Sequence, residues 1–423
     1  MRVCYLDHYA GSPTAGMEFR PHAMAVEWAR LGADTTIVAG TYSHLRTRNF
    51  PDAEPGRPYD VDGVEFRFLR TRQYEGNGAG RILSWVDYVG GGLRAAKTMA
   101  RELRPDAVIS SSTYPFDTYF AQRLARLSDA RLIHEVHDLW PLTPIELGGH
   151  SPRHPLMAAM AAAERSAYAN SDAIVSILPN IEPHVRALGI DTPVIPIPNG
   201  IDAVATPAPA PDAFVRLIDD LRSPRSLSRA PREAAARVEA SGPRRVLGYA
   251  GGMTTANAMD DLVAAMALLR DEPVTAVLLG DGLYRADLER QARESGADVV
   301  FFGSLPKSQV HDALTRCDAL YIGSKRSALY EYGVSANKIF DYMLTGVPIV
   351  DAFDSDHSPL AYSGCAVSAR AEDPADIARA IREAVSLPDP QRERRGAAGI
   401  AWVKEHHSLP TLAAEFLGVL ATA

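Results

Sequence analysis

Short apolar segments alternate with amphipathic helical segments along this chain, and the alternation runs twice. The first run extends from Val3–Leu6 to Ala173–Ile177, and the second begins at Val246–Tyr249 and continues past Val347–Asp351. Strands that alternate with helices form parallel sheets covered by helices on both faces. We therefore expect two consecutive α/β domains, each a doubly wound sheet of the Rossmann type.

A segment rich in proline, alanine, arginine and serine separates the two runs. A chain of 423 residues also exceeds the size of one ordinary hydrophobic core. We predict a first domain at residues 1–200, a connection at 201–244 with one short helix near Ala213–Leu221, and a second domain at 245–400. The helical segment 401–423 is predicted to return to the first domain.

The composition is that of a soluble globular protein, with 46% hydrophobic and 23% charged residues. A net charge of −8 argues against a dedicated nucleic-acid binder, which is normally basic. The three cysteines, Cys4, Cys317 and Cys365, are widely spaced and are expected to be reduced core residues, not a disulfide or metal set. Without a secretory signal or an 18-residue apolar run, we expect a cytoplasmic protein, with contact at the inner membrane face left open.

The segment from Ser335 to Gly346 combines the start of a helix with a carboxylate. Ser335 is expected to cap the first turn, Gly333 allows a tight bend before it, and Gly346 ends the helix before the apolar strand Val347–Val350. Such a helix start favours an anion, and Asp341 about two turns further in could accept a hydrogen bond from a sugar hydroxyl. A nucleotide-sugar pocket is one interpretation; a capped helix with a solvated aspartate is the other.

Glycine-containing turns follow several of the expected strands. Gly251 and Gly252 end the first strand of the second half, where they would let a diphosphate approach backbone N–H groups. Gly280-Asp281-Gly282 follows a later strand, and Gly16 lies in the loop after the first strand of the chain. The turn at Gly251 and Gly252 has neither the dinucleotide nor the P-loop fingerprint. Turns that need glycine only for their backbone are the alternative.

The segment from His134 to Pro141 places several polar side chains at the end of a strand. His137 and Asp138 resemble an active-site pair in which the acid orients the imidazole. His134 and His137 alone are thin support for a metal site, and none is predicted. Glu146 adds a carboxylate from the following loop.

The segment around Asp341 resembles the nucleotide-sugar binding segment of GT-B glycosyltransferases of family 4. That family carries a Glu-x7-Glu pattern, and Asp341 matches its second acid, which binds the donor ribose. The first acid would fall at Gly333, so the pattern is broken there, and Glu331 lies two residues earlier. Further segments resemble WbuB-like transferases that build bacterial surface polysaccharides: Tyr42–Arg46, Tyr74–Gly78, Asp138–Pro141 and Pro198–Asp202.

This resemblance implies two Rossmann-like domains that face a central cleft, with the acceptor on the first and the donor on the second. It implies a retaining, metal-independent hexosyl- or N-acetylhexosaminyl-transferase. The donor is a nucleoside-diphosphate sugar, with UDP the favoured carrier, and no further cofactor is needed. The hydroxyl acceptor would belong to polysaccharide or glycoconjugate synthesis, with a lipid-linked acceptor left open.

The resemblance also suggests roles for individual residues. Family members often carry an arginine and a lysine after the glycine turn, where this chain has Met253–Asn257, so Lys338 is expected to supply the missing charge. The catalytic group would be His137, Asp138 and Lys338. The donor-binding group would be Gly16, Gly251, Gly252, Gly280, Ser304, Leu305, Ser335, Ala336, Asn337 and Asp341. The acceptor side would include His8, Tyr9 and Glu146, although a structural histidine is the alternative for His8.

Three other functions fit the same features. A transferase that glycosylates a small natural product would differ only in its acceptor. A nucleotide-sugar 2-epimerase would use the same fold and nucleotide pocket but would need no acceptor. A non-catalytic nucleotide-sugar binder is compatible with the missing acid at Gly333 and the missing cations after Gly252.

Overall fold

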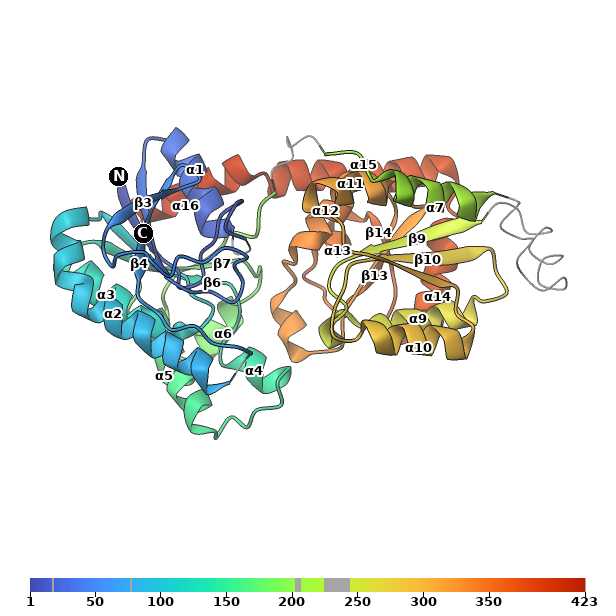
Figure 1. Ribbon diagram of the computed structural model, residues 1–423. Coiled ribbons are helices and arrows are strands. Elements are labelled where there is room, and N and C mark those ends of the chain that lie inside the picture. Colours follow the sequence, from blue (N-terminus) through green and yellow to red (C-terminus); the bar gives the residue numbers. More distant parts are fainter. Residues whose placement is uncertain (17–18, 77, 202–206, 224–243, 423) are drawn as a thin grey trace. The chain divides into compact units, whose positions relative to one another are not determined.

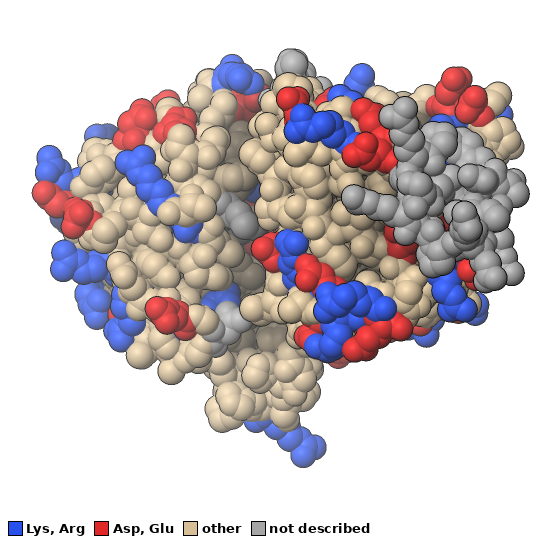
Figure 2. Space-filling model, turned by 45° about the vertical axis from the view of Figure 1, so that its right-hand side comes forward, with Lys and Arg blue, Asp and Glu red and all other residues tan. Residues whose placement is uncertain are grey.

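The computed structural model describes residues 1–16, 19–76, 78–201, 207–223 and 244–422 (Figure 1). The chain divides into two compact units, one formed by Met1–Asn199 with Leu409–Ala423 and the other by Gly200–Ser408. Each unit is a parallel-sheet α/β domain, which confirms the predicted fold class. Figure 2 shows acidic and basic side chains interspersed over one face of the molecule.

The described part of the first unit contains an eight-stranded sheet with the order β3-β4-β2-β1-β5-β6-β7-β8. Its strands are β1 Arg2–Leu6, β2 Asp34–Gly40, β3 Pro58–Val61, β4 Val64–Leu69, β5 Ala107–Ser110, β6 Arg131–Val136, β7 Ala173–Ser176 and β8 Val194–Pro196. Only the β3–β4 pair in this sheet is antiparallel. Parallel neighbours end at the same edge of the sheet, so the loops after β1, β5 and β6 meet there.

Helices cover both faces of this sheet. They are α1 Arg20–Arg30, α2 Ala79–Leu103, α3 Thr118–Ser128, α4 Leu142–Glu146, α5 Pro155–Ala169, α6 Glu182–Ala187 and α16 Leu409–Thr422, with a 3₁₀ turn η1 at Pro115–Asp117. The C-terminal helix α16 completes this core: the Trp28 indole N–H donates to the Ala413 carbonyl at 2.8 Å, and the rings of Trp28 and Phe416 pack edge to face.

The second unit has a six-stranded parallel sheet within its described residues, with the order β11-β10-β9-β12-β13-β14. Its strands are β9 Arg245–Ala250, β10 Val274–Leu279, β11 Val299–Gly303, β12 Ala319–Gly323, β13 Ile349–Ala352 and β14 Ala366–Ser368. Its helices are α7 Asp212–Arg222, α9 Met259–Leu268, α10 Arg285–Ser295, α11 Lys307–Thr315, α12 Asn337–Thr345, α13 Pro359–Ser363, α14 Pro374–Val385 and α15 Asp389–His406, with 3₁₀ turns η3 at Thr255–Asn257 and η4 at Ala328–Tyr332.

The expected connection differs in part from the structure. Helix α7 lies where the short helix was expected, but its residues Phe214 and Ile218 are buried in the core of the second unit with Val246. Residues 202–206 and 224–243 of this segment lie outside the described part of the chain. At the other end, α15 continues to His406 within the second unit, beyond the expected boundary at residue 400.

Strands β3 and β4 form a hairpin across Asp62 and Gly63. Both turn residues have positive φ values, 51° and 83°, as a two-residue hairpin turn of type I′ requires. The three cysteines are free and buried, as predicted. Across the described ranges, no helix has the length and apolarity to cross a membrane.

The glycine run Gly90-Gly91-Gly92 lies inside α2, which is continuous for 25 residues. Gly92 has a clear packing reason, because a Cβ atom there would lie 2.4 Å from Cδ1 of Phe120 on α3. A Cβ atom on Gly90 would have only the flexible Arg94 guanidinium nearby, at 3.6 Å. The close approach of α2 to α3 therefore depends on one glycine of the three.

We predict opposite effects for Gly92→Ala and Gly90→Ala. Gly92→Ala should lower the free energy of unfolding by about 1–3 kcal/mol, because Phe120 must move. Gly90→Ala should raise it by up to ~1 kcal/mol, because alanine favours a helix interior. Denaturant unfolding of both variants checks this, and equal effects of the two substitutions would contradict the packing argument.

Candidate functional site

Backbone hydrogen bonds join the loops at the carboxyl ends of β9, β10 and β11. The Gly251 N–H donates to the Leu279 carbonyl at 2.9 Å, and the Gly280 N–H donates to the Gly303 carbonyl at 2.9 Å. Gly280 has a φ of 136°, and a Cβ atom there would lie 2.0 Å from the Gly251 carbonyl oxygen. The Gly251 N–H, expected to face a diphosphate, is thus used within the fold, and Gly280 permits the close approach of the two loops.

Lys338 reaches the glycine turn from α12. Its ammonium donates to Oδ1 of Asn257, lies 5.2 Å from the centroid of the Tyr249 ring, and would be 3.6 Å from a Cβ atom on Gly251. The Gly252 carbonyl accepts hydrogen bonds from Tyr249 and Asn257, both at 2.8 Å. Burial lowers the pKa of Lys338 to about 8. A half-buried cation therefore lies beside the turn, where sequence analysis expected one.

The start of α12 differs from the expectation. Helix α12 begins at Asn337 after Ala336, and its first turn has no side-chain cap, so the predicted capping role of Ser335 is wrong. Gly333 has a φ of 104°, a conformation in which an L-amino acid with a side chain is strained. Glycine therefore suits the backbone at the position where the family pattern has its first acid. Glu331 lies exposed on η4.

Asp341 follows Lys338 by three residues on α12 and forms an ion pair with Lys307 at the start of α11. The Asp341 side chain is 19% exposed and that of Lys307 is 72% exposed, so solvent weakens the pair and a ligand can displace the lysine. Ser304 and Leu305 lie in the loop just before α11. Lys307, which was not predicted, thus connects the predicted ribose acid with the end of the loop that holds Ser304 and Leu305, two predicted donor-binding residues.

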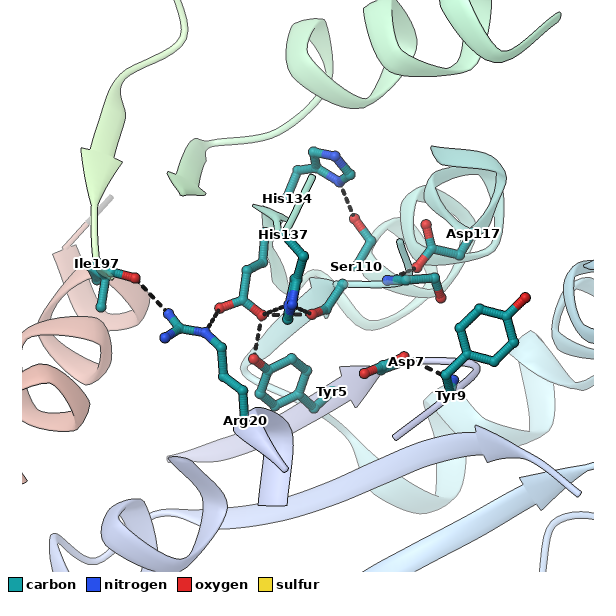
Figure 3. A network of polar contacts seen from close by, with 12 residues as sticks. Tyr5, Asp7, Tyr9, Arg20, Ser110, Asp117, His134, His137 and Ile197 are labelled. Atoms are coloured by element: carbon teal, nitrogen blue, oxygen red, sulfur yellow. Dashed lines mark hydrogen bonds and ion pairs between the residues drawn. The ribbon is translucent and has the colours of Figure 1, made fainter. Parts of the chain in front are cut away.

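In the first unit, a buried carboxylate organises the ends of β1, β5 and β6 (Figure 3). The Glu135 side chain is 0% exposed and accepts hydrogen bonds from Arg20 Nε at 2.8 Å, Ser111 Oγ at 2.6 Å and the Tyr5 hydroxyl. His137 Nε2 lies 3.0 Å from the same carboxylate. Burial alone would raise the pKa of Glu135, but Arg20 and His137 outweigh it and hold this pKa below its usual range.

This network corrects the expected pairing of His137 with Asp138. The carboxylate hydrogen-bonded to the imidazole is Glu135, whereas Asp138 accepts hydrogen bonds from the Thr143 hydroxyl at 2.5 Å and the Trp140 indole at 3.2 Å. Asp138 therefore stabilises the turn that leads into α4. Burial raises the pKa of Asp138 above its ordinary value.

His8 and Tyr9 are buried structural residues, which corrects their expected acceptor contact. The His8 ring stacks between Tyr9 and Tyr88, with centroid distances of 4.4 and 4.7 Å, and its Nδ1 lies 2.8 Å from the Tyr114 hydroxyl. Burial lowers the pKa of His8 well below its ordinary value. The Tyr9 hydroxyl accepts a hydrogen bond from the Trp85 indole at 2.6 Å. Both side chains are enclosed within the first unit.

Gly16 and Glu146 remain predictions. Gly16 has a φ of 106°, and a Cβ atom there would lie 2.7 Å from the Thr47 amide nitrogen, so the backbone requires glycine. The two residues that follow Gly16 lie outside the described part of the chain. Glu146 is exposed at the last residue of α4.

A groove of about 1230 Å³ runs between β4 and α2 and contains none of the predicted site residues. Its charged lining is mainly basic: Arg57, Arg67, Arg70, Arg72 and Arg94, with Asp87 and Glu102. Several of these arginines already have carboxylate partners, such as Arg72 with Asp87 at 2.6 Å. No local sequence pattern indicates this groove, because its residues come from separate strands and a helix face.

Comparisons with known proteins address both halves of the chain. A family model described as "Glycosyl transferase 4-like domain" matches residues 15–200, and one described as "Glycosyl transferases group 1" matches residues 244–386. Solved structures of GT-B enzymes match over nearly the whole chain. This chain is a glycosyltransferase of the GT-B type. A search of curated proteins finds no match to its sequence.

The similar structures share the fold of this glycosyltransferase at low sequence identity. Anabaena HepE in complex with UDP is 15% identical, with 100% of both chains covered and a TM-score of 0.67. Sucrose-phosphate synthase from Thermosynechococcus elongatus is 14% identical, with 99% of this chain and 98% of that chain covered and a TM-score of 0.69. A trehalose-6-phosphate structure from E. coli bound with UDP-2-fluoro glucose is 12% identical, with 100% and 99% covered and a TM-score of 0.68.

In the first unit, Asp117 is a buried acid whose titration tests the electrostatics around His137. Asp117 Oδ2 accepts a hydrogen bond from the Ser112 amide at 2.9 Å, and its Oδ1 has no hydrogen-bond partner among the described residues. Burial raises the pKa of Asp117 from 3.8 to about 7. The unfolded chain therefore releases this proton at lower pH than the folded protein does, and stability falls as the pH rises from about 4 to 7.

We predict that Asp117→Asn removes part of this pH dependence. The free energy of unfolding of the variant minus that of the parent protein should be about 2 kcal/mol higher at pH 8 than at pH 5. Thermal or urea unfolding at the two pH values measures it. A variant that loses the same stability at both values would show that Asp117 does not titrate in this range.

Proposed function

We propose that this glycosyltransferase transfers a sugar from a UDP-sugar to a hydroxyl acceptor, with retention at the anomeric carbon, in polysaccharide or glycoconjugate synthesis. The observation that supports it best is the pair Lys338 and Asp341 on α12, three residues apart on one side of the helix. Lys338 lies beside the glycine turn and suits a diphosphate. Asp341 suits the ribose hydroxyls, next to the loop of Ser304 and Leu305 that suits the base.

The similar structures support the choice of donor. HepE has been solved with UDP and with UDP-glucose, and the E. coli structure is bound with UDP-2-fluoro glucose. We extend this donor class to the present chain as part of the proposal, with a hexosyl or N-acetylhexosaminyl group as the transferred sugar. A cytoplasmic reaction with a lipid-linked acceptor is the first version to test.

In this proposal, the main chemical demand is the negative charge that develops on the departing diphosphate. A cation fixed before the reaction stabilises this charge without reorganisation, most strongly where water is partly excluded. The half-buried Lys338 ammonium, held by Asn257 and by the face of Tyr249, meets that description. The proposed reaction uses this cation in place of a metal ion.

Incubating purified protein with UDP-sugars, with and without candidate acceptors, tests the reaction. A new glycoside that keeps the anomeric configuration of the donor supports the proposal. An epimerised donor formed without acceptor would identify an epimerase instead. Donor binding with no product over a broad acceptor panel would favour a non-catalytic binder.

We predict that Asp341→Ala weakens UDP binding by at least about 10-fold, because hydrogen bonds to a charged group contribute about 1.5–3 kcal/mol. Lys307→Ala removes the partner of the acid but leaves the acid in place, so it should leave UDP affinity unchanged or improve it. Calorimetric titration of both variants with UDP measures this. Equal affinity of Asp341→Ala and the parent protein would remove Asp341 from the ribose role.

Lys338 predicts a pH dependence of donor binding. Its pKa of about 8 means that the ammonium is mostly charged at pH 7 and loses its charge as the pH rises through 8. UDP affinity should therefore fall between pH 7 and pH 9.5 in the parent protein. Lys338→Met should bind UDP weakly at both pH values, whereas Lys338→Arg should keep its affinity at pH 9.5. A steep pH dependence that persists in Lys338→Met would assign it to another group.

A further inference from the structure

Strand β9 leaves its neighbour β12 just before the glycine turn at Gly251. The ladder between the two strands consists of Leu247 with Ala319 and Gly248 with Leu320, so within the described sheet the strands have separated at Ala250. Ala250 is buried. A buried backbone N–H or C=O without a partner is costly. The backbone of Ala250 therefore needs a hydrogen-bond partner from another element.

The hydroxyl group of Tyr342, on α12, supplies this partner. The Ala250 N–H donates to the hydroxyl oxygen at 2.6 Å, and the hydroxyl donates to the Ala250 carbonyl at 3.1 Å. Tyr342 is 1% exposed, and burial raises its pKa well above the ordinary value, so the hydroxyl keeps its proton. One side chain of α12 thus satisfies both backbone groups of the residue that precedes the glycine turn.

Lys338 reaches the same end of β9 from the same helix. It precedes Tyr342 by four residues, so the two side chains lie on one face of α12. The Lys338 ammonium lies 5.2 Å from the centroid of the Tyr249 ring and would be 3.6 Å from a Cβ atom on Gly251. Tyr342 is bonded to Ala250, the residue between these two. A shift of α12 that breaks the bonds of the hydroxyl therefore also moves the ammonium.

We propose that Tyr342 is a positioning residue for the donor: its hydroxyl ties α12 to Ala250 and so holds the Lys338 ammonium at the glycine turn, where it faces the diphosphate. The diphosphate rests on the proposed function, whereas the hold on Lys338 does not. Tyr342 is enclosed in the core of the second unit, so it acts only through Lys338.

The groups around Lys338 leave its titration distinct. Burial raises the pKa of Tyr249 above its ordinary value, as it does for Tyr342, so both tyrosines stay neutral near pH 8. Asp341, on the same helix, is ion-paired with Lys307. Burial lowers the pKa of Lys338 to about 8. A titration near pH 8 at this turn therefore belongs to Lys338.

The first test needs no ligand and uses Tyr342→Phe, which removes a single oxygen atom. Without that atom Ala250 loses its partner, α12 is released and water reaches the ammonium, so the pKa of Lys338 should rise above 8. Carbon NMR of protein labelled at the lysine ε position follows the titration. The chain has five lysines, and Lys338→Met assigns the signal. An unchanged pKa of Lys338 in Tyr342→Phe would overturn the inference.

Tyr88→Phe is the matched control. The Tyr88 hydroxyl, on α2 of the first unit, is fully buried and donates to the Val38 carbonyl at 2.7 Å. Both variants lose a buried hydroxyl that is bonded to the backbone, so both melting temperatures should fall by about 2–6 °C. Tyr321→Phe removes a buried hydroxyl that has no hydrogen-bond partner among the described residues. Neither control should change the titration of Lys338.

Calorimetric titration with UDP at pH 7 connects this contact to the donor. Tyr342→Phe should weaken UDP binding by about 3–10-fold, the range of one ordinary hydrogen bond. Tyr88→Phe should keep the affinity of the parent protein. Equal losses in the two variants would show that lowered stability, not the position of Lys338, weakens binding, and the inference would then be wrong.

A double variant decides whether Tyr342 acts through Lys338. Once Lys338→Met has removed the ammonium, adding Tyr342→Phe should lower UDP affinity by less than about a further twofold. Losses that multiply would assign Tyr342 an effect independent of Lys338, against the inference. A parent protein that does not bind UDP would refute the proposed function, and the lysine titration would still decide whether Tyr342 holds Lys338.

Discussion

The ion pair between Arg20 and Glu135 is the interaction on which the first unit's functional edge depends. It joins the first residue of α1 to the end of β6, and through the Arg20 guanidinium it also binds the carbonyls of Ile197 and Pro198 that follow β8. Three segments that are distant in sequence are thereby held at one edge of the sheet. A hydrophobic contact would allow small displacements there, whereas a buried ion pair with directed hydrogen bonds fixes the side chains.

In the second unit, backbone hydrogen bonds hold the loops after β9, β10 and β11 together at one edge of the sheet. Gly280 is required because its loop approaches the Gly251 carbonyl more closely than any side chain would permit. A structural need for glycine at this position does not exclude a ligand nearby. The Lys338 ammonium lies beside the same turn, 3.6 Å from where a Cβ atom on Gly251 would be. At this turn, the glycines determine the path of the backbone and Lys338 supplies a positive charge.

Local pattern was sufficient to predict the alternation of strands and helices and the short helix before β9. The expectation that Lys338 lies near the glycine turn came from the family resemblance. Partners that are distant in sequence were not predictable. Lys307 lies 34 residues from Asp341, and Glu135 lies 115 residues from Arg20. A glutamate within the apolar segment Leu132–Val136 was the available signal, because such a residue needs a buried cation. The enclosure of His8 depends on aromatic rings from two other segments, which periodicity cannot show.

The place of α16 has a consequence for how this protein is made. The core of the first unit includes Leu412, Phe416 and Leu420, and Phe416 packs edge to face against the indole of Trp28. During translation, residues of the second unit therefore leave the ribosome while the first sheet still lacks one of its covering helices. Domains usually fold in the order of their synthesis. Here the earlier domain is finished last, so the nascent chain must keep an apolar surface accessible until the ribosome has added α16.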